Sequence, residues 1–509
     1  DVAPSRGLGD VYKRQLPEDA PEKWELFKTY CIRDVDVEKQ IRKKLWKYPI
    51  PEKEQQLYCL DQRINDRGIM VDRNLVNHAI ACDLLYKETA TKRAYELSEL
   101  ENPNSVSQLK GWLTEKGIEV DSLAKATVEE LVDKTEGDVQ EMLKLRLAMS
   151  KTSVKKYEAI DRSVCRESRV HGLLQFFGAN RTGRWAGRLV QIHNLPQNHI
   201  SDLELARGLV AEGRYDDVEM LYESIPNVLS ELIRTAFVAK PGSRFIISDF
   251  SAIEARVLAW LAGEQWRIEV FQTHGKIYEA SASAMFHVPI EEITKTSPLR
   301  QKGKISELAL GYGGSVGAMT AMGALKMGLS EEELPSLVTT WRNANPHITQ
   351  FWWAVDEAAV KAVRDKKPSR VGRVAFEYSS GILFVTLPSG RKLSYVKPKM
   401  GVNKFGREGI TYEGIGESKK WVRLETYGPK LVENIVQATS RDILAEAMIR
   451  LEDAGFDIVC HVHDEVVLEV PEGVSSVDEI NEIMAVNPEW TDGLPLSAAG
   501  FESPFYKKD

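Results

Sequence analysis

FIISDFSAIEARVLAWLAGE, residues 245–264, is the stretch on which the fold and the chemistry of this chain depend. Its β-branched and aromatic beginning predicts a buried strand, and the apolar spacing of its second half predicts a helix. Asp249 lies where the strand ends, a position suited to holding a metal ion. Ser251 and Glu254 also fit an S-x-x-E capping box, in which both side chains satisfy free backbone N–H groups at a helix start. A purely structural role for these residues therefore stays open from this stretch alone.

The composition is that of a large globular protein. The chain has 509 residues, of which 43% are hydrophobic and 28% charged, enough for roughly two to four domains. Its net charge of −8 gives no global sign of a nucleic-acid partner. The five cysteines lie far apart without a C-x-x-C pair, which argues against a zinc module or a disulfide framework. No apolar run reaches the roughly 18 residues that span a bilayer, so we expect no membrane partner.

The beginning of the chain divides into two parts. Residues 1–15, DVAPSRGLGDVYKRQ, match no periodic pattern and resemble adapter-like read-through, so we exclude them from fold reasoning. Residues 20–47 are expected to form a helix, on which Tyr30 and Asp34 share one face. A plain surface Tyr–Asp pair is the alternative to a functional pair.

Four longer segments have clear patterns. Residues 52–100 are expected to be helical with a turn at residues 67–68, and the amphipathic residues 128–162 are long enough for two antiparallel helices. Residues 370–425 are Gly-rich and alternate in polarity, which predicts short strands and loops. Residues 429–451 have the periodicity of a helix.

A local excess of positive charge runs through residues 151–188, where nine Lys or Arg stand against three Asp or Glu. In an acidic chain this excess suggests a surface that faces phosphates, with a solvated helix face as the alternative. The loop ANRTGRWAGR, residues 179–188, favours the first interpretation. Its glycines allow a close approach of the backbone to a ligand, and Arg181, Arg184 and Arg188 carry planar donors suited to phosphate or minor-groove acceptors.

A second helical pattern occupies SPLRQKGKISELALGYGG, residues 297–314. Arg300, Lys304, Leu308 and Tyr312 are spaced by four and trace a shallow spiral, about 18 Å from end to end. Two cations, an apolar contact and a tyrosine would suit a triphosphate with its sugar and base. A solvated basic pair beside a core tyrosine explains the same spacing.

The segment FDIVCHVHDEVVLEV, residues 456–470, predicts a β-hairpin with His463 and Asp464 at its tip. A polar turn is the simplest explanation of these residues. Glu465 follows Asp464 directly, however, and adjacent like charges beside buried strands cost stability unless a cation or solvent offsets them.

The order of these motifs resembles that of the family A DNA polymerases. DFSAIEARVLAWLAGE is similar to motif A, RQKGKISELALGYG to motif B and HVHDEVVLEV to motif C, and TGR at 182–184, HNLP at 193–196 and NSVSQL at 104–109 also resemble family segments. The closest likeness is to bacteriophage or prophage DNA polymerase I-like enzymes.

The resemblance implies an α+β multidomain, right-hand polymerase, with an antiparallel palm sheet and helical fingers and thumb, behind the remnant of a DnaQ-like exonuclease domain. The expected divisions are 1–15, non-native segment; 16–48, exonuclease remnant; 49–84, connection; 85–185, thumb; 186–262, palm; 263–428, fingers; and 429–509, palm.

The resemblance also implies template-directed addition of deoxynucleotides to a primer 3′-hydroxyl. Asp249, Asp464 and the backbone carbonyl of Phe250 would hold two Mg²⁺ ions, for which Mn²⁺ could substitute. Lys304 would be the proton donor to the leaving group. The implied nucleotide-binding residues are Arg300, Lys304, Leu308, Tyr312, Glu254, Ser251 and His463, with Glu254 hydrogen-bonded to Tyr312 and excluding a ribose 2′-hydroxyl. The implied DNA-binding residues are Arg184, Arg181, Arg188, Thr182, Asn194, Gln437, His463 and Glu465.

Some expectations concern what this chain lacks or changes. Tyr30 and Asp34 resemble the last motif of the exonuclease family, but the other carboxylates are missing, so no nuclease activity is expected. Leu308 stands where the family has Phe or Tyr, which predicts a looser sugar pocket. A monomer in the cytoplasm of a bacterial or phage-infected cell is implied, with primer–template DNA and dNTPs as partners. The alternatives are a single-subunit RNA polymerase, against which Glu254 argues, and a non-catalytic DNA-binding remnant.

Overall fold

The computed structural model describes residues 17–151, 154–402, 406, 408–416 and 418–508, so the expectation for residues 1–15 lies outside the described residues. The chain forms two compact units, Asp1–Cys59 and Leu60–Asp509. Among the described residues no helix is both long enough and apolar enough to cross a bilayer.

The first unit contains η1 (Pro17–Asp19), α2 (Pro21–Leu45) and the beginning of α3 (Glu52–Arg67). The expected helix over residues 20–47 is therefore confirmed. None of the side chains of α2 is buried. Tyr30 and Asp34 lie one turn apart on this helix, and both are exposed.

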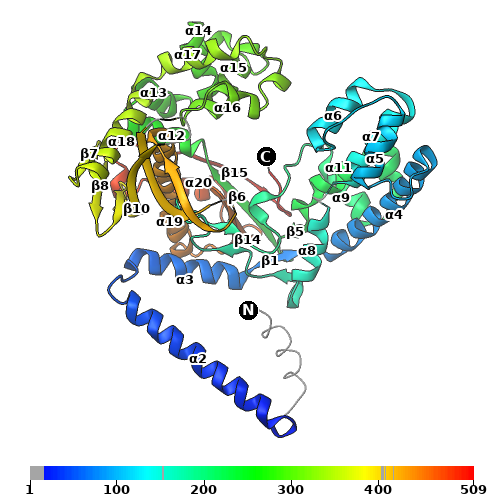
Figure 1. Cartoon of the computed structure of the whole chain (residues 1–509), viewed down its shortest axis with the longest axis horizontal. Helices are drawn as coiled ribbons and strands as arrows, with labels where there is room; N and C mark the ends of the chain where they lie inside the picture. The colour runs from blue at the N-terminus through cyan, green and yellow to red at the C-terminus, as the bar shows by residue number, and fades with distance from the viewer. Residues whose placement is uncertain (1–16, 152–153, 403–405, 407, 417, 509) are drawn as a thin grey trace. The chain divides into compact units, whose positions relative to one another are not determined.

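The second unit begins with a group of helices that follow the short strand β1 (Ile69–Val71). The long helix α4 starts after Asp72, whose carboxylate accepts a hydrogen bond from the Leu75 backbone N–H. Trp112 and the neighbouring leucines form a small core where α5, α6 and α7 meet α4 (Figure 1). The helices are α4 (Arg73–Ser98), α5 (Val106–Glu115), α6 (Lys125–Lys134), α7 (Gly137–Met149) and α8 (Lys155–Ser163).

The expectation of two antiparallel helices over residues 128–162 is wrong, because three helices share this segment. The chain leaves α6 in an extended conformation at Thr135, and Gly137 has a φ of 61°. Such a left-handed position favours glycine and interrupts a continuous helix.

Short elements connect these helices to the central sheet. They form a three-stranded sheet of order β2-β1-β5 and the two-stranded pair β3-β4. The elements are η2 (Arg166–Ser168), β2 (Arg169–Val170), β3 (Leu174–Gln175), β4 (Ala186–Gly187), η3 (Ile192–Asn194), α9 (Leu203–Ala211), α10 (Tyr215–Leu221), α11 (Ile225–Leu232), η4 (Arg234–Ala236) and β5 (Phe237–Val238).

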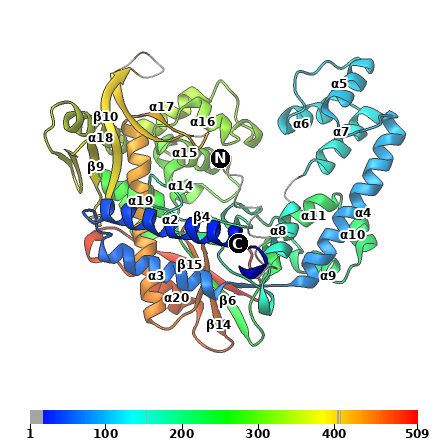
Figure 2. The same cartoon turned by 60° about the horizontal axis from the view of Figure 1, so that its bottom comes forward.

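The central sheet joins strands from distant parts of the chain. Its order is β13-β14-β6-β15, with every neighbouring pair antiparallel. The strands are β6 (Ser243–Phe250), β13 (Ile458–Val462), β14 (Glu465–Pro471) and β15 (Ala498–Ser503). The helix α20 (Val477–Ala485) lies against β6 and β15 (Figure 2), where Ser248 Oγ donates a hydrogen bond to Asn481 Oδ1 at 2.7 Å. The buried helix α19 (Gly428–Asp453) packs beside it and confirms the helix expected over residues 429–451.

A second group of helices lies between β6 and α19 in the sequence. Gly303 allows α14 and α15 to pack closely, because a Cβ at this position would lie 2.3 Å from the Tyr278 carbonyl oxygen. Arg267 and Glu307 form a buried ion pair, and Trp341 Nε1 donates to Glu307 Oε1 at 2.9 Å. The elements are α12 (Ile253–Ala262), α13 (Gln265–Thr273), α14 (Ile277–Phe286), η5 (Ile290–Glu292), α15 (Pro298–Leu310), α16 (Val316–Ala321), η6 (Leu325–Met327), α17 (Leu334–Ala344) and α18 (Pro346–Arg364).

The strands expected over residues 370–425 form one six-stranded antiparallel sheet. Its order, β12-β11-β10-β9-β8-β7, follows the chain in reverse, so each strand pairs with its neighbour in sequence. The sheet lies beside α18 (Figure 2). The strands are β7 (Ser369–Val371), β8 (Val374–Ser379), β9 (Ile382–Thr386), β10 (Lys392–Val402), β11 (Glu408–Ile415) and β12 (Trp421–Thr426), and η7 (Glu489–Thr491) lies later, before β15.

Candidate functional site

Two aspartates that are far apart in the sequence meet at one end of the central sheet. Asp249 lies near the end of β6, and strand pairing places it directly opposite Glu465 of β14. Asp464 precedes Glu465 in the turn, and its carbonyl oxygen accepts a hydrogen bond from the Phe250 backbone N–H at 3.3 Å. The antiparallel register of the two strands thus brings Asp249 and Asp464 together.

The turn between β13 and β14 consists of His463 and Asp464 alone. His463 has a φ of 59°, in the left-handed region that two-residue hairpin turns require and that few non-glycine residues adopt. The expected hairpin with His463 and Asp464 at its tip is confirmed.

Negative charge is concentrated and partly buried here. Burial first, and then the neighbouring Asp464, raise the pKa of Asp249 from 3.8 to about 7. Lys508 opposes this shift, since its Nζ lies 3.7 Å from Asp249 Oδ2 and 3.1 Å from Glu465 Oε2. Burial lowers the pKa of Lys508, but the two carboxylates outweigh that effect and raise it.

The oxygen atoms at this point suit a hard divalent cation. Among the described residues, Asp249 Oδ1 is buried and has no hydrogen-bond partner, which leaves a carboxylate oxygen available for a ligand. The neighbouring Asp464 carboxylate acts on that of Asp249, and oxygen is the donor that Mg²⁺ prefers. Within the described part of the chain no three His, Cys, Asp or Glu residues are grouped to hold a metal ion. Mg²⁺ bound by two carboxylates would therefore take its other ligands from water and from substrate phosphates, as is usual for this ion.

Glu465 has a structural position, and its expected contact with DNA stays a prediction. Its side chain is only 2% exposed and accepts a hydrogen bond from Tyr506 Oη at 2.7 Å. Tyr506 Oη in turn accepts a hydrogen bond from Arg234 Nη1 at 2.6 Å. Burial raises the pKa of Glu465, and Lys508 opposes that rise. The adjacent like charges of Asp464 and Glu465 are thus offset by a cation from the C-terminal segment.

Glu254 links three parts of the site. Its Oε2 accepts a hydrogen bond from Tyr312 Oη at 2.7 Å, the contact that the family resemblance implies. Its Oε1 lies 3.1 Å from Arg184 Nη2. Burial, followed by Glu254, raises the pKa of Tyr312 well above its usual value. The first turn of α12 thereby holds the end of α15 and the 179–188 loop together.

The capping box expected at the start of α12 is wrong. The N-cap is Ala252, in a left-handed conformation, and it makes no side-chain cap hydrogen bond. The Glu254 carboxylate is bound by Tyr312 and Arg184 instead of reaching back to the backbone. Ser251 takes part through its backbone, since its N–H donates to the Ser497 carbonyl and its carbonyl accepts from Arg256 Nε at 2.6 Å.

The helix α15 carries three of the seven residues expected to bind a nucleotide, and Tyr312 lies just beyond its end. Arg300 Nε lies 2.6 Å from Glu279 Oε1, so this guanidinium is held by a carboxylate of α14. Lys304 makes no ion pair with any described residue and is half-buried. Leu308 is 48% exposed, which leaves its side chain available to a ligand.

The 179–188 loop separates into buried and accessible parts. Gly183 has a φ of 77°, and a Cβ there would lie 2.8 Å from a ring carbon of Phe177, so the tight turn needs glycine. Thr182 is 4% exposed, and its expected contact with DNA stays a prediction. Arg181 lies over the rings of Tyr395 and Tyr412, which contact each other, at 4.7 and 4.4 Å from their centroids.

The other expected DNA contacts are accessible. Arg188 and Asn194 are exposed, and Gln437 is half-buried on α19. Arg184 forms an ion pair with Glu254. Burial first, and then Arg184, lower the pKa of His463 at the hairpin tip.

Sequence reasoning missed a cluster of rings beneath the hairpin tip. His193 lies between His463 and His461, with ring centroids 5.4 and 6.2 Å apart, and Trp185 packs on His461 at 4.7 Å. Burial lowers the pKa of His193 to about 4. The sequence signal was present, since His193 begins HNLP and His461 lies two residues before His463. Lys508, in contrast, lies in no motif, and only folding brings it to Asp249.

Comparisons with known proteins agree with this geometry. The family model described as DNA polymerase family A matches residues 85–370. The chain is 58% identical over 499 residues to the DNA polymerase of Bacillus phage SP02, a match that covers 97% of this chain and 77% of that protein. It is 29% identical over 268 residues to the thermostable DNA polymerase I of Thermus aquaticus, covering 51% of this chain and 27% of that protein. In fold it is similar to the solved POL domain of Pol1 from M. smegmatis in complex with DNA primer-template and dNTP, with a TM-score of 0.62, 20% identity, and coverage of 92% of this chain and 74% of that one.

The right-hand α+β fold with its antiparallel sheet is that of a DNA polymerase, and the chain belongs to DNA polymerase family A. It is a DNA-directed DNA polymerase of the phage type, and its activity is template-directed DNA synthesis.

Proposed function

We propose that Asp249 and Asp464 are the catalytic carboxylates of this polymerase and that they hold two Mg²⁺ ions, for which Mn²⁺ can substitute. The observation that carries the proposal is the strand register that sets the two aspartates side by side, with one buried oxygen of Asp249 unpartnered among the described residues. A divalent cation bound there would polarise the primer 3′-hydroxyl and neutralise charge on the leaving pyrophosphate.

The surrounding side chains provide the other parts of the reaction. Arg300 and Lys304 are proposed to bind the triphosphate, with Lys304 giving a proton to the leaving group. Arg300 would exchange Glu279 for phosphate oxygens, because a guanidinium binds both kinds of acceptor. The absence of an ion pair on Lys304 among the described residues leaves its ammonium available for this role.

The contacts of Glu254 support a role in sugar selection. Tyr312 is proposed to pack beside the nascent base pair, with Glu254 closing the space that a ribose 2′-hydroxyl would need. Arg184 and His463 are proposed to contact the primer end. Gln437 on α19 would then lie on the template side, and Arg188 and Asn194 at the DNA backbone.

We also propose the division of this fold into thumb, 85–185; palm, 186–262 and 429–509; and fingers, 263–428. The enzyme is proposed to work as a monomer in the cytoplasm of a bacterial or phage-infected cell, with primer–template DNA and dNTPs as partners. Tyr30 and Asp34, both exposed on α2, are proposed to mark a DnaQ-like segment without nuclease activity of its own.

Primer extension with deoxynucleotides and MgCl₂ tests the catalytic assignment. Asp464→Ala should lower the extension rate by on the order of 1000-fold, because loss of a metal ligand removes several kcal/mol of transition-state stabilisation. Glu502→Gln, on the exposed edge of β15, is the matched control and should extend normally. Undiminished synthesis by Asp464→Ala would refute the assignment, and wild-type protein that binds primer–template without extending it would favour the non-catalytic alternative.

Sugar selection can be tested at two positions. Glu254→Ala should raise the use of ribonucleotides relative to deoxynucleotides by roughly 10- to 100-fold, because it opens the space beside Tyr312. An unchanged ratio, or equal use of both nucleotides by the wild type, would argue against the role of Glu254. For the exposed Leu308, Leu308→Phe and Leu308→Tyr should change dideoxynucleotide discrimination, and three identical ratios would remove the proposed sugar-pocket role.

A further inference from the structure

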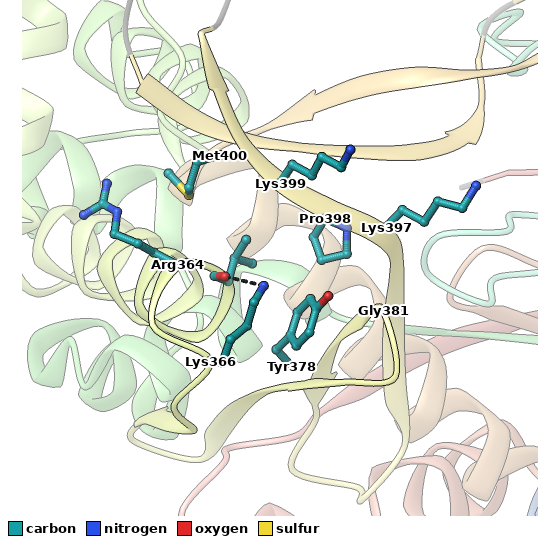
Figure 3. Close-up of a pocket in the computed structure, with 9 residues that line it drawn as sticks. Arg364, Lys366, Tyr378, Gly381, Lys397, Pro398, Lys399 and Met400 are labelled. Atoms are coloured by element: carbon teal, nitrogen blue, oxygen red, sulfur yellow. Dashed lines mark hydrogen bonds between the residues drawn. The ribbon is translucent and has the colours of Figure 1, made fainter.

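A basic pocket lies on the six-stranded sheet, away from the residues discussed so far. It has a volume of about 480 Å³ and opens between the end of α18 and the strands β8 to β10 (Figure 3). The described residues that line it include four cations, one tyrosine and no carboxylate. The cations are Arg364, Lys366, Lys397 and Lys399.

A β-bulge in β10 changes the direction of the lysine side chains at the pocket. The pairing of β10 with β11 shifts register between Val396 and Lys399, and Lys397 has a φ of 45°. Such a bulge re-aims side chains and occurs often beside functional sites. Figure 3 shows Lys397 and Lys399 extending the same way from β10.

The charges of the pocket are only partly neutralised. Lys397 Nζ lies 2.8 Å from Glu413, and Arg364 lies 2.7 Å from Glu408. Lys399 has no ion-pair partner among the described residues. Lys366 Nζ lies 3.3 Å from the Tyr378 ring centroid and donates to the Val363 carbonyl, so its ammonium is held in place without a carboxylate.

The pocket belongs to a part of the sequence that is rich in positive charge. Residues 364–425 contain 14 Lys or Arg against six Asp or Glu, whereas the whole chain has a net charge of −8. A local excess of this size in an acidic protein attracts polyanions.

Strand β10 connects the pocket to the template side of the proposed catalytic site. Tyr395 on β10 accepts a hydrogen bond from Asn434 Nδ2 at 3.0 Å, and Asn434 lies one turn before Gln437 on α19. Tyr395 also contacts Arg181 of the 179–188 loop. Lys399 is four residues further along β10, beyond the bulge, so the pocket and the contacts of Tyr395 belong to the same strand.

We propose that this pocket binds the phosphodiester backbone of single-stranded template DNA that has not yet entered the catalytic site. The proposal rests on the proposed function, since it takes Gln437 to lie on the template side. Lysines are suited to this task because an ammonium binds phosphate as a point charge without reading sequence.

The test compares the binding of two substrates with the same duplex, one blunt and one with a 5′ template overhang of about ten nucleotides. Fluorescence anisotropy gives Kd at several NaCl concentrations. The double variant Lys397→Gln/Lys399→Gln should lose roughly threefold to tenfold in affinity for the overhang substrate and keep its affinity for the blunt one. Its slope of log K against log salt on the overhang should become shallower by about 1.4, for two lost phosphate contacts on a single strand. Lys419→Gln/Lys420→Gln is the matched control, because these exposed lysines lie on the same sheet outside the pocket, and it should change the affinity less than twofold.

Three results would overturn the proposal: equal losses on the overhang and blunt substrates, no loss on either, or the same loss in the control variant. Inorganic tripolyphosphate distinguishes DNA backbone from a free polyphosphate as the ligand. If DNA is the ligand, tripolyphosphate should compete with the overhang substrate no better than NaCl of equal ionic strength. Selective competition in the wild type, but not in the double variant, would mean that the pocket binds a polyphosphate and not the template. Because binding is measured without synthesis, failure of this proposal is separate from failure of the catalytic assignment.

Discussion

The four-stranded sheet β13-β14-β6-β15 and the six-stranded sheet β12-β11-β10-β9-β8-β7 are both antiparallel, yet they hold charge differently. In the first, Glu465 is buried and bonded to Tyr506, which is bonded to the buried Arg234. In the second, Lys397 is largely exposed, and Glu413 and Arg423, which pair around the bulge of β10, are partly exposed. Burial therefore shifts the pKa of charged side chains in the first sheet, whereas the second sheet presents more of its charge to the solvent.

The difference follows from how each sheet is assembled. Asp249 and Asp464 are 215 residues apart, and their encounter needs the whole fold. The six-stranded sheet is a meander whose neighbouring strands are neighbours in sequence, so local pairing suffices. A site that must raise a carboxylate pKa belongs in the buried sheet, because desolvation is the main cause of that shift.

Replacing arginine by methionine at positions of different burial tests this difference between the two sheets. Arg234 is 3% exposed and donates to Tyr506 Oη and to the carbonyls of Leu195 and Pro196. Arg234→Met should lower the free energy of unfolding by about 3–5 kcal/mol, because it leaves buried acceptors unpaired and Glu465 without the support of a cation behind Tyr506. Urea unfolding followed by circular dichroism measures the change. A loss below about 1 kcal/mol would mean that the buried network adds no more than a surface pair.

How far the sequence predicts the molecule differs between the two sheets. Motif order along the chain is enough to propose Asp249, Asp464 and the α15 residues as a site, because the spacing within each motif is local and chemically restrictive. The strands of the six-stranded sheet are predicted by alternation, but its pocket is not, since the bulge at Lys397 and the position of Lys366 over Tyr378 depend on tertiary packing. Lys508 and Arg234 also escape prediction, because their partners lie hundreds of residues away. The capping box fails for a related reason: a local pattern at Glu254 is overridden by Tyr312 and Arg184.

The loss of stability at acid pH gives a second test of burial, at His193 beneath the hairpin tip. The pKa of His193 is about 4 in the folded protein against 6.5 for a free histidine, with burial as the main cause. Between these values the unfolded chain binds a proton that the folded chain resists, so stability is lost as the pH falls from about 6.5 to 4. The loss is on the order of 2–3 kcal/mol for this residue.

His193→Gln should therefore lose less stability than the wild type between pH 7 and about pH 4.5, in metal-free urea unfolding. The exposed His199 supplies the control, since His199→Gln should keep the wild-type pH dependence. The six-stranded sheet has no histidine in residues 369–426 and cannot produce this effect. Equal pH dependence in all three proteins would show that His193 is not held neutral by its surroundings.

Arg181 joins the 179–188 loop to the six-stranded sheet and is intermediate in burial. Its guanidinium contacts the rings of both Tyr395 and Tyr412 and donates to the Ser394 carbonyl at 2.6 Å. Arg181→Met should cost about 1–2 kcal/mol of unfolding free energy, because two cation–π contacts are lost while methionine keeps part of the packing. Arg181→Lys separates charge from shape: a lysine that restores full stability would show that the planar guanidinium is not needed.

The smallest loss of unfolding free energy is expected at Arg423, on the six-stranded sheet. Arg423 is 37% exposed and lies 3.2 Å from Glu413, which Lys397 also contacts at 2.8 Å. Because water screens this pair and Lys397 remains to neutralise Glu413, Arg423→Met should change the unfolding free energy by less than about 1 kcal/mol. High salt should remove even that difference, whereas it should leave most of the Arg234→Met deficit. We infer that the four-stranded sheet uses its charges for its own structure and the six-stranded sheet uses them for an external partner. A loss of unfolding free energy at Arg423 as large as that at Arg234 would contradict this inference.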